Sequence, residues 1–255
     1  MARLAAHLVL GLAAEAFVFP HLNEKRRAQT IARWSRRLLH ILNVRLLLSG
    51  EIPTRPSLLV ANHVSWLDIF VINSLCPSRF VAKSEIRDWR VLGWLTAKAG
   101  TFFLQREKRA DLKEITATLT KVLENGQRVA IFPEGTTTGG DSLNHFHASM
   151  FDPAVRAQVE VIPVALRFTR ADGSLNHDAA FVGETTFWES LRQVVAEPQL
   201  WVTLHFARPL SSVNKNRREL ARAAEQAIAS ALARMKPETT ADLQAEPRLN
   251  SLPTR

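Results

Sequence analysis

Cysteine is almost absent from this chain. Cys76 is the only one among 255 residues, so no internal disulfide bond can form, which is typical of a protein from a reducing compartment. It precedes Pro77 at the predicted end of a helix, where we interpret it as a packing residue. The chain also has no G-x-S-x-G elbow and no cysteine in a comparable turn, so nothing predicts a covalent intermediate on a side chain.

Long hydrophobic runs are also scarce, and a mean hydropathy near zero excludes a membrane protein with several spanning helices. The apolar stretch Leu4–Leu22 is interrupted by Glu15 and Pro20 and is barely long enough to cross a bilayer. We expect a shallow or re-entrant membrane anchor that forms a helical hairpin with the next helix. A signal peptide cleaved at Ala14-Glu15-Ala16 is the alternative, but its apolar core, Leu8–Ala13, is shorter than such signals use.

Positive charge is concentrated near the N-terminus. Residues 1–50 carry eight Lys or Arg and two Glu, whereas the formal net charge of the whole chain is +9. No nucleic-acid-binding motif accompanies these residues, and aromatics are not interleaved with them for base stacking, so we expect no nucleic-acid partner. Within Lys25–Asn43, apolar residues recur at helical spacing with arginines on the other side, as in a helix attracted to anionic lipid headgroups. A basic helix packed on the protein core fits the same pattern, and both can hold at once.

The rest of the chain alternates between short apolar runs and helical patterns, which predicts an α/β fold: a layered mixed sheet flanked by helices, after the N-terminal membrane-anchoring hairpin. The predicted strands are Arg45–Leu48, Leu58–Ala61, Arg79–Ala82, Thr101–Leu104, Val129–Phe132, Val161–Phe168 and Leu200–Phe206. The predicted helices are Trp66–Leu75, Val91–Ala99, Ala110–Asn125, Thr186–Val195 and Arg217–Met235. We divide the chain into membrane-associating helices (1–43), a catalytic domain (44–211), a C-terminal helix (212–236) and a disordered tail (237–255).

A histidine and a carboxylate follow one of the predicted buried strands. His63 and Asp68 would lie about 140° apart on an uninterrupted helix and could not pair there. Ser65 and Asp68 have the spacing of a capping box, with Ser65 as N-cap and Asp68 facing back. His63 then lies in the loop before the helix, where Asp68 can bond one ring nitrogen and leave the other free, as for a general base. The alternative is that Asp68 only caps the helix and His63 is a turn residue.

Three further segments accompany this motif in order along the chain. Phe103 and Arg106 follow a predicted strand, Phe132–Thr136 reads F-P-E-G-T, and Pro163 lies inside an apolar strand. Together with the N-H-x-x-x-x-D pattern that ends at Asp68, they resemble the four sequence blocks of the glycerolipid acyltransferase family, whose best-known members are bacterial lysophosphatidic acid acyltransferases. The resemblance covers roughly residues 30 to 210.

The resemblance implies a membrane-associated enzyme that moves a fatty acyl group from acyl-CoA or acyl carrier protein to the free hydroxyl of a lyso-lipid. His63 would act as general base and Asp68 as its orienting partner. Residues that would bind the substrate are Phe103, Arg106, Glu134, Gly135 and Thr136, with Glu134 on the acceptor, Arg106 on its headgroup, and the Gly135–Thr136 backbone able to donate to the tetrahedral intermediate. No cofactor or metal is expected. The expected partners are membrane lipids and the acyl donor, at the cytoplasmic face of the inner or cell membrane.

The chain departs from the commonest family pattern at two positions. Thr137 follows the E-G-T where an arginine is usual, and His147 stands where a lysine is usual. Two cations suited to a phosphate monoester are therefore missing. Family frequency still places 1-acylglycerol-3-phosphate first as acceptor, giving phosphatidic acid, with a lyso-lipid such as lyso-ornithine lipid as the alternative.

Two other classes of protein compete with this interpretation. His63, His145 and His147 could form a metal site with Asp68, which would indicate a metal-dependent hydrolase. A non-enzymatic membrane-binding protein would need a degenerate site, and the intact His63 and Asp68 argue against it.

Overall fold

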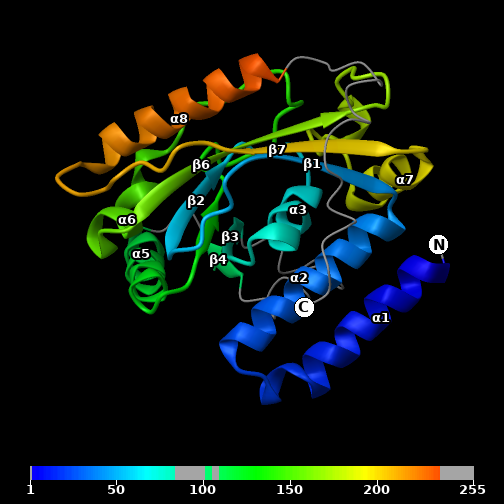
Figure 1. The fold of residues 1–255 in the computed structure, drawn as a ribbon, viewed down its shortest axis with the longest axis horizontal. Helices are drawn as coiled ribbons and strands as arrows, with labels where there is room; N and C mark the ends of the chain where they lie inside the picture. The colour runs from blue at the N-terminus through cyan, green and yellow to red at the C-terminus, as the bar shows by residue number, and fades with distance from the viewer. Residues whose placement is uncertain (1, 84–100, 105–108, 236–255) are drawn as a thin grey trace.

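The structure is a computed structural model that describes residues 2–83, 101–104 and 109–235. A seven-stranded sheet forms its centre, in the order β1-β7-β6-β2-β5-β3-β4 (Figure 1). The strands are β1 Val44–Gly50, β2 Ser57–Ala61, β3 Arg79–Lys83, β4 Phe102–Leu104, β5 Val129–Ile131, β6 Glu160–Thr169 and β7 Leu200–Phe206. All neighbours pair parallel except β6 and β7, which pair antiparallel. The predicted mixed sheet is confirmed.

Helices cover both faces of this sheet. The α-helices are α1 Ala2–Phe17, α2 Glu24–Ile41, α3 Leu67–Leu75, α5 Arg109–Glu124, α6 Asp152–Ala157, α7 Phe187–Ala196 and α8 Arg217–Arg234. Short 3-10 helices are η1 Phe19–His21, η3 Ala148–Phe151 and η4 His177–Ala179. The predicted helix Val91–Ala99 lies outside the described residues.

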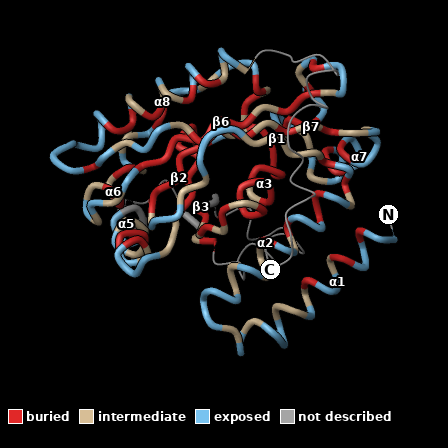
Figure 2. Tube along the Cα trace, in the orientation of Figure 1, coloured by how far each residue is buried: buried red, intermediate tan, exposed pale blue. Residues whose placement is uncertain are grey.

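The core lies in two layers, one on each face of the sheet (Figure 2). Successive side chains of a strand point to opposite faces, so Leu59 and Ala61 of β2 join the layer under α2, α3 and α7. Leu58 and Val60 join the other layer, under α5, α6 and α8. Because β2 is buried on both faces, it is a rigid support for the loop that follows it.

The N-terminal helices α1 and α2 lie side by side below the sheet (Figure 1). Helix α2 packs on α3 and buries Leu38 and Leu39 in the core, whereas α1 buries only Leu4, His7 and Gly11 along its length. No helix among the described residues is long and apolar enough to cross a membrane. The predicted helical pair is therefore present, and its anchoring role is not confirmed.

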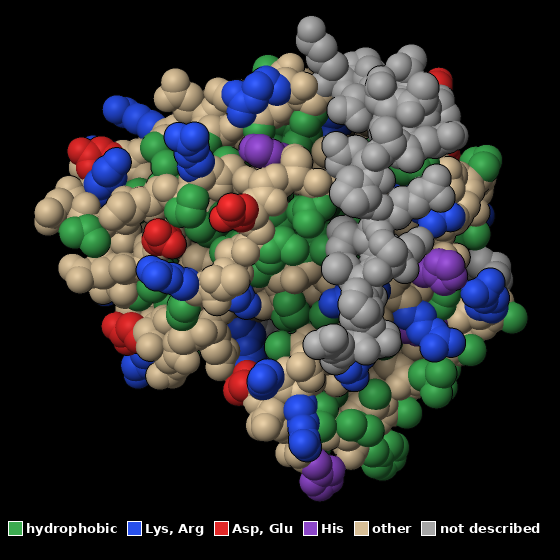
Figure 3. All heavy atoms as spheres, viewed as in Figure 1, with side chains coloured by type: hydrophobic (Ala, Val, Ile, Leu, Met, Phe, Trp, Pro, Cys, Tyr) green, Lys and Arg blue, Asp and Glu red, His purple; other side chains and the backbone are tan. Residues whose placement is uncertain are grey.

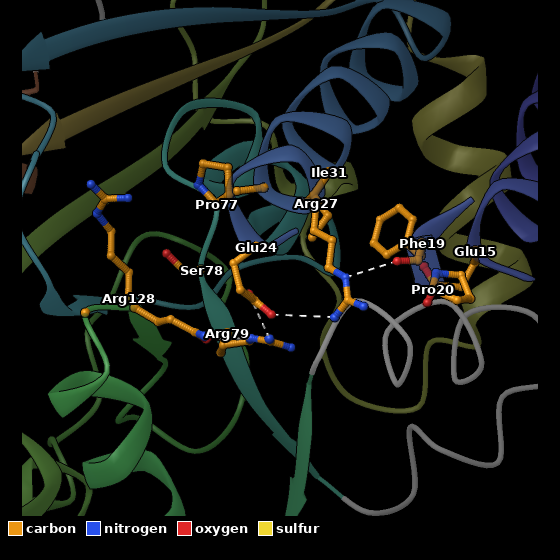
Figure 4. A pocket seen from close by; sticks show the side chains of 13 residues that line it. Glu15, Phe19, Pro20, Glu24, Arg27, Ile31, Pro77, Ser78, Arg79 and Arg128 are labelled. Carbon is orange, nitrogen blue, oxygen red and sulfur yellow. Dashed lines mark hydrogen bonds and ion pairs between the residues drawn. The ribbon is translucent and has the colours of Figure 1, made fainter. Parts of the chain in front are cut away.

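A charged contact joins these helices to the sheet. Glu24, at the start of α2, pairs with Arg27 at 3.5 Å and with Arg79, the first residue of β3, at 3.3 Å (Figure 4). A cavity of about 390 Å³ lies beside this contact, between η1, α2 and the segment before β5. Because β3 and β5 are parallel and begin here, the cavity lies at the edge of the sheet where these strands start.

Candidate active site

The carboxyl ends of β2 and β5 bring two sequence motifs together. The two strands are parallel neighbours, so His63 follows β2 at the same edge of the sheet where Glu134 follows β5. This edge is where ligands usually bind in open α/β sheets. It is the opposite edge from the cavity beside Glu24.

His63 and Asp68 form the predicted pair. The ring Nδ1 of His63 lies 2.7 Å from Oδ2 of Asp68. Asp68 is fully buried, whereas the His63 side chain is 20% exposed. Since a carboxylate accepts hydrogen bonds, a neutral His63 ring holds its proton on Nδ1 and has its lone pair on Nε2. The geometry therefore suits a base whose second nitrogen receives a proton.

The capping box predicted at this turn is only half formed, so that detail of the prediction is wrong. Asp68 Oδ2 does accept the backbone N–H of Ser65 at 3.0 Å, and also that of Val64 at 2.8 Å. Helix α3 has Trp66 as its N-cap, however, and the buried Ser65 Oγ has no hydrogen-bond partner among the described residues. The Ser65 carbonyl already accepts the Asp68 N–H in a tight turn, which takes the donor that the Ser65 hydroxyl would need.

Asn62 fixes the end of β2. The residue is 1% exposed. Its side-chain amide makes the two hydrogen bonds with Leu166 of β6 that a backbone amide would make in a sheet: Nδ2 donates to the Leu166 carbonyl at 2.9 Å, and Oδ1 accepts the Leu166 N–H at 2.7 Å. The β2–β6 ladder is thereby extended past Ala61 to the residue before His63. The sequence motif contains Asn62, but only the strand pairing reveals its role.

Glu134 contacts the main chain of His63. Its Oε1 accepts the His63 N–H at 2.8 Å, and its Oε2 accepts the Asn144 N–H at 2.8 Å. Only 4% of Glu134 is exposed. Burial raises the pKa of the Glu134 carboxyl above its ordinary value, although the two backbone donors oppose this shift. The carboxylate thus joins the loop after β2 to the loop around Asn144.

Two further residues of the segment 132–138 hold the histidine. The Phe132 ring stacks on the His63 ring with a centroid distance of 4.0 Å and an interplanar angle of 11°. The Thr138 N–H donates to the His63 carbonyl at 2.8 Å. The F-P-E-G-T motif indicates a site, but neither contact can be read from its letters.

The other predicted substrate-binding residues are Gly135, Thr136, Phe103 and Arg106, and the structure describes the first three of them. The Gly135 N–H donates to the Phe132 carbonyl within the turn, whereas the exposed Thr136 makes no hydrogen bond within the part of the chain that the structure describes. Phe103 lies in β4, and Arg106 lies outside the described residues.

The two departures from the family pattern also have defined surroundings. The Thr137 hydroxyl donates to the carbonyl of Phe181, and the Phe181 N–H donates to the carbonyl of Val64. These bonds join the loop that contains Phe181 to Val64, the residue after His63, which the sequence does not reveal. His147 is exposed, and its N–H donates to the carbonyl of Pro133.

The alternative metal site is not supported. His145 pairs with Glu225 of α8 at 3.1 Å, and its side chain is 79% exposed. The buried Phe146 separates it from His147. No group of three or more His, Cys, Asp or Glu that could hold a metal ion occurs among residues 2–83, 101–104 and 109–235.

Cys76, which precedes Pro77, is buried. Burial raises the pKa of its thiol and fits the predicted packing role.

Comparison with known proteins gives a consistent picture. A family model described as Acyltransferase matches residues 43–167. The chain is 38% identical over 237 residues to a lyso-ornithine lipid O-acyltransferase from Pseudomonas aeruginosa, and the match covers 91% of each chain. It is 40% identical over 144 residues to a 1-acyl-sn-glycerol-3-phosphate acyltransferase from Neisseria meningitidis serogroup B, over 56% of each chain. The crystal structure of the 1-acyl-sn-glycerophosphate acyltransferase PlsC from Thermotoga maritima is similar with a TM-score of 0.62 at 22% identity, over 93% of this chain and 88% of that one. This last likeness concerns the fold alone.

Proposed function

Because this chain belongs to the acyltransferase family, we propose that it transfers a fatty acyl group from acyl-CoA or acyl carrier protein to the free hydroxyl of a lyso-lipid. The observation that carries the proposal is the 2.7 Å contact between His63 Nδ1 and Asp68, which leaves Nε2 available to a substrate hydroxyl. The scheme uses only groups of the protein and the two substrates, and it needs no cofactor or metal.

The transfer is direct. His63 Nε2 takes the proton of the acceptor hydroxyl while the oxygen attacks the thioester carbonyl carbon. The negative charge of Asp68 stabilises the imidazolium that forms. When the tetrahedral intermediate collapses, the C–S bond breaks and the imidazolium returns its proton to the leaving thiolate. Of the two predicted backbone donors to the oxyanion, Thr136 is the better candidate, since the Gly135 N–H already donates within its turn.

We favour a lyso-ornithine lipid as acceptor over 1-acylglycerol-3-phosphate, the acceptor that family frequency places first. The Pseudomonas aeruginosa relative is similar over 91% of both chains, whereas the Neisseria meningitidis relative is similar over 56%. Thr137 supplies no cation for a phosphate, and its hydroxyl is directed to the Phe181 carbonyl. Arg106 remains the predicted headgroup ligand, with Phe103 three residues before it in the sequence.

An assay of purified protein with a panel of lyso-lipids and both thioester donors tests the activity. We expect product with lyso-ornithine lipid, and we expect Thr137→Arg to improve the use of lysophosphatidic acid selectively, because arginine pairs strongly with a phosphate monoester. A wild-type enzyme that already prefers lysophosphatidic acid, with no change in Thr137→Arg, would contradict the favoured acceptor. No transfer with any lyso-lipid or donor would contradict the activity itself.

In this proposal, residues 1–43 provide the membrane contact and residues 44–211 form the catalytic domain. Residues 212–236 contain a helix that supports this domain. Helix α1 exposes Leu10 and Phe17 by 63% and 76%, and Figure 3 shows hydrophobic side chains gathered at the lower right, where α1 lies. Basic residues of α2 add attraction to anionic headgroups. Both thioester donors are made in the cytosol, so the proposed location is the cytoplasmic face of the cell membrane.

A further inference from the structure

Glu134 has a place in the site that differs from that of a substrate ligand. Its two carboxylate oxygens each accept a backbone N–H at 2.8 Å, from His63 and from Asn144. Only 4% of the residue is exposed. A headgroup would have to displace these short, charge-assisted bonds to reach either oxygen in the same direction.

The hydrogen bond from the His63 N–H to Glu134 fixes the position of the His63 main chain, whereas the contact with Asp68 fixes the orientation of the His63 ring. The main chain of His63 is held on both sides by the segment 132–138: Glu134 accepts its N–H, and Thr138 donates to its carbonyl at 2.8 Å. Without the carboxylate, the backbone N–H groups of His63 and Asn144 would both lose these acceptors. The loop would move to recover partners, and a displacement of about 1 Å at a reacting group can lower a rate about 100-fold.

We propose that Glu134 is a positioning residue, which acts on catalysis through the main chain of His63 and does not contact the acceptor. The inference rests on the proposed function, because it assigns His63 the role of the base. It replaces the acceptor-binding role that the sequence resemblance implies for this glutamate.

The chain offers a matched control in Glu225 of α8. This carboxylate accepts the Phe146 N–H at 2.8 Å and pairs with His145, so it holds the same loop as Glu134 does. The structure shows no hydrogen bond or ion pair between Glu225 and His63, both of which it describes. A change at Glu225 therefore disturbs the loop without touching the histidine.

The test compares Glu134→Gln and Glu134→Asp with Glu225→Gln in the full-length protein. The single carbonyl of glutamine accepts only one of the two N–H groups, and aspartate keeps the charge but is one methylene too short to reach both. We expect both Glu134 variants to lose about 10-fold to 100-fold in kcat, with the KM for the acceptor within about twofold of wild type. The loss should be the same for every acceptor that the wild type uses, and Glu225→Gln should stay within about twofold of wild type.

A second measurement does not depend on turnover. The ring C–H signals of His63, assigned by their absence in His63→Ala, are recorded by NMR in the ligand-free proteins. We expect them to shift in both Glu134 variants and to stay in place in Glu225→Gln.

Either of two results overturns the inference. In the first, the acceptor KM rises about tenfold or more while kcat is kept and Glu134→Asp is nearly normal, which assigns Glu134 to the acceptor. In the second, neither kinetics nor the His63 signals change. A wild-type protein without acyl transfer would instead contradict the proposed function, and the NMR comparison would still decide whether Glu134 positions His63.

Discussion

His63 is restrained by contacts that each fix a different degree of freedom. Glu134 and Thr138 hold its main chain, Asp68 sets the ring torsion and the tautomer, and Phe132 covers one ring face. The His63 side chain remains 20% exposed. In the proposed reaction, such restraint would lower the entropy that must be lost when the acceptor hydroxyl is brought to Nε2.

The first prediction concerns the pair that carries the proposed chemistry. His63→Ala should abolish acyl transfer without unfolding the protein, since the general base is lost from a partly exposed position. Asp68→Asn should lower kcat at least about 100-fold, because an amide cannot stabilise the imidazolium by charge. Steady-state assays measure both, with His147→Ala as the exposed-histidine control. Substantial turnover by folded His63→Ala would exclude the mechanism, and a loss in His147→Ala would revive the metal-site alternative.

The pairing of His63 with Asp68 could be predicted from sequence because both residues lie in one turn. Local spacing decides whether such side chains meet. The contact of Glu134 with the His63 N–H could not be predicted from sequence, because it depends on β5 lying beside β2 in the sheet. Sequence could likewise indicate that Ser65 lies near the start of a helix. It could not indicate that the Asp68 N–H would donate to the Ser65 carbonyl instead of to the Ser65 hydroxyl.

At the level of elements, the strands follow the prediction closely because each is a short apolar run bounded by turn residues. Helix α6 was not predicted, since six residues that begin Asp152-Pro153 give too little periodicity to recognise. The interaction of Asn62 with β6 shows how an element's end is fixed by a side chain that replaces the next backbone pair.

Asn62 and Asn73 form a matched pair for a second prediction. Both are buried, at 1% and 3% exposure, and both accept a backbone N–H, from Leu166 and Ser78 respectively. Replacing either by alanine leaves a buried donor unpaired and should lower the free energy of unfolding by about 1–3 kcal/mol, measured by urea denaturation. Only Asn62→Ala should also lower kcat, because it alone frees the residue before His63. Equal kcat in the two variants would show that the strand end does not position the base.

The docking of α1 on α2 provides a third prediction, on pH. His7 of α1 is 5% exposed, stacks on Trp34 at 4.6 Å and bonds its carbonyl at 3.1 Å. Burial, with a smaller contribution from the charge of Arg37, lowers the pKa of His7 below 6.5, although the bond to the Trp34 carbonyl opposes this shift. The detached helix therefore binds a proton more readily than the docked one, so docking is favoured above the ordinary histidine pKa and weakens as the pH falls through it.

Hydrogen exchange of the α1 amides should accordingly be faster at pH 5 than at pH 7.5, after correction for the intrinsic rate. His7→Phe keeps a stacked ring but cannot be protonated, so its α1 protection should not depend on pH. The same pH dependence in both proteins would show that His7 does not control the docking.

On the scale of the whole molecule, the strand order could not be predicted, because it depends on contacts between segments far apart in the chain. Both β1–β7 and β2–β6 join strands more than a hundred residues apart. The N-terminal helices illustrate the same limit. Sequence allowed α2 to lie on a membrane or on the core, and the structure buries its Leu38 and Leu39 in the same layer as α3. A deletion of residues 1–43 would therefore damage the core as well as any membrane contact.

The last prediction tests membrane binding without that damage. Leu10 and Phe17 are exposed on α1. Val213 is 51% exposed and belongs to the segment between β7 and α8, and Figure 1 shows that the start of α8 is far from α1. The double variant Leu10→Glu/Phe17→Glu should sediment with anionic vesicles at least about tenfold less than wild type, because each change removes apolar burial and adds repulsion. Val213→Glu should bind as wild type does. High salt should release the wild type only in part, since ionic strength screens the arginines of α2 but not apolar contact. If the double variant and Val213→Glu bind equally, α1 is not the membrane contact.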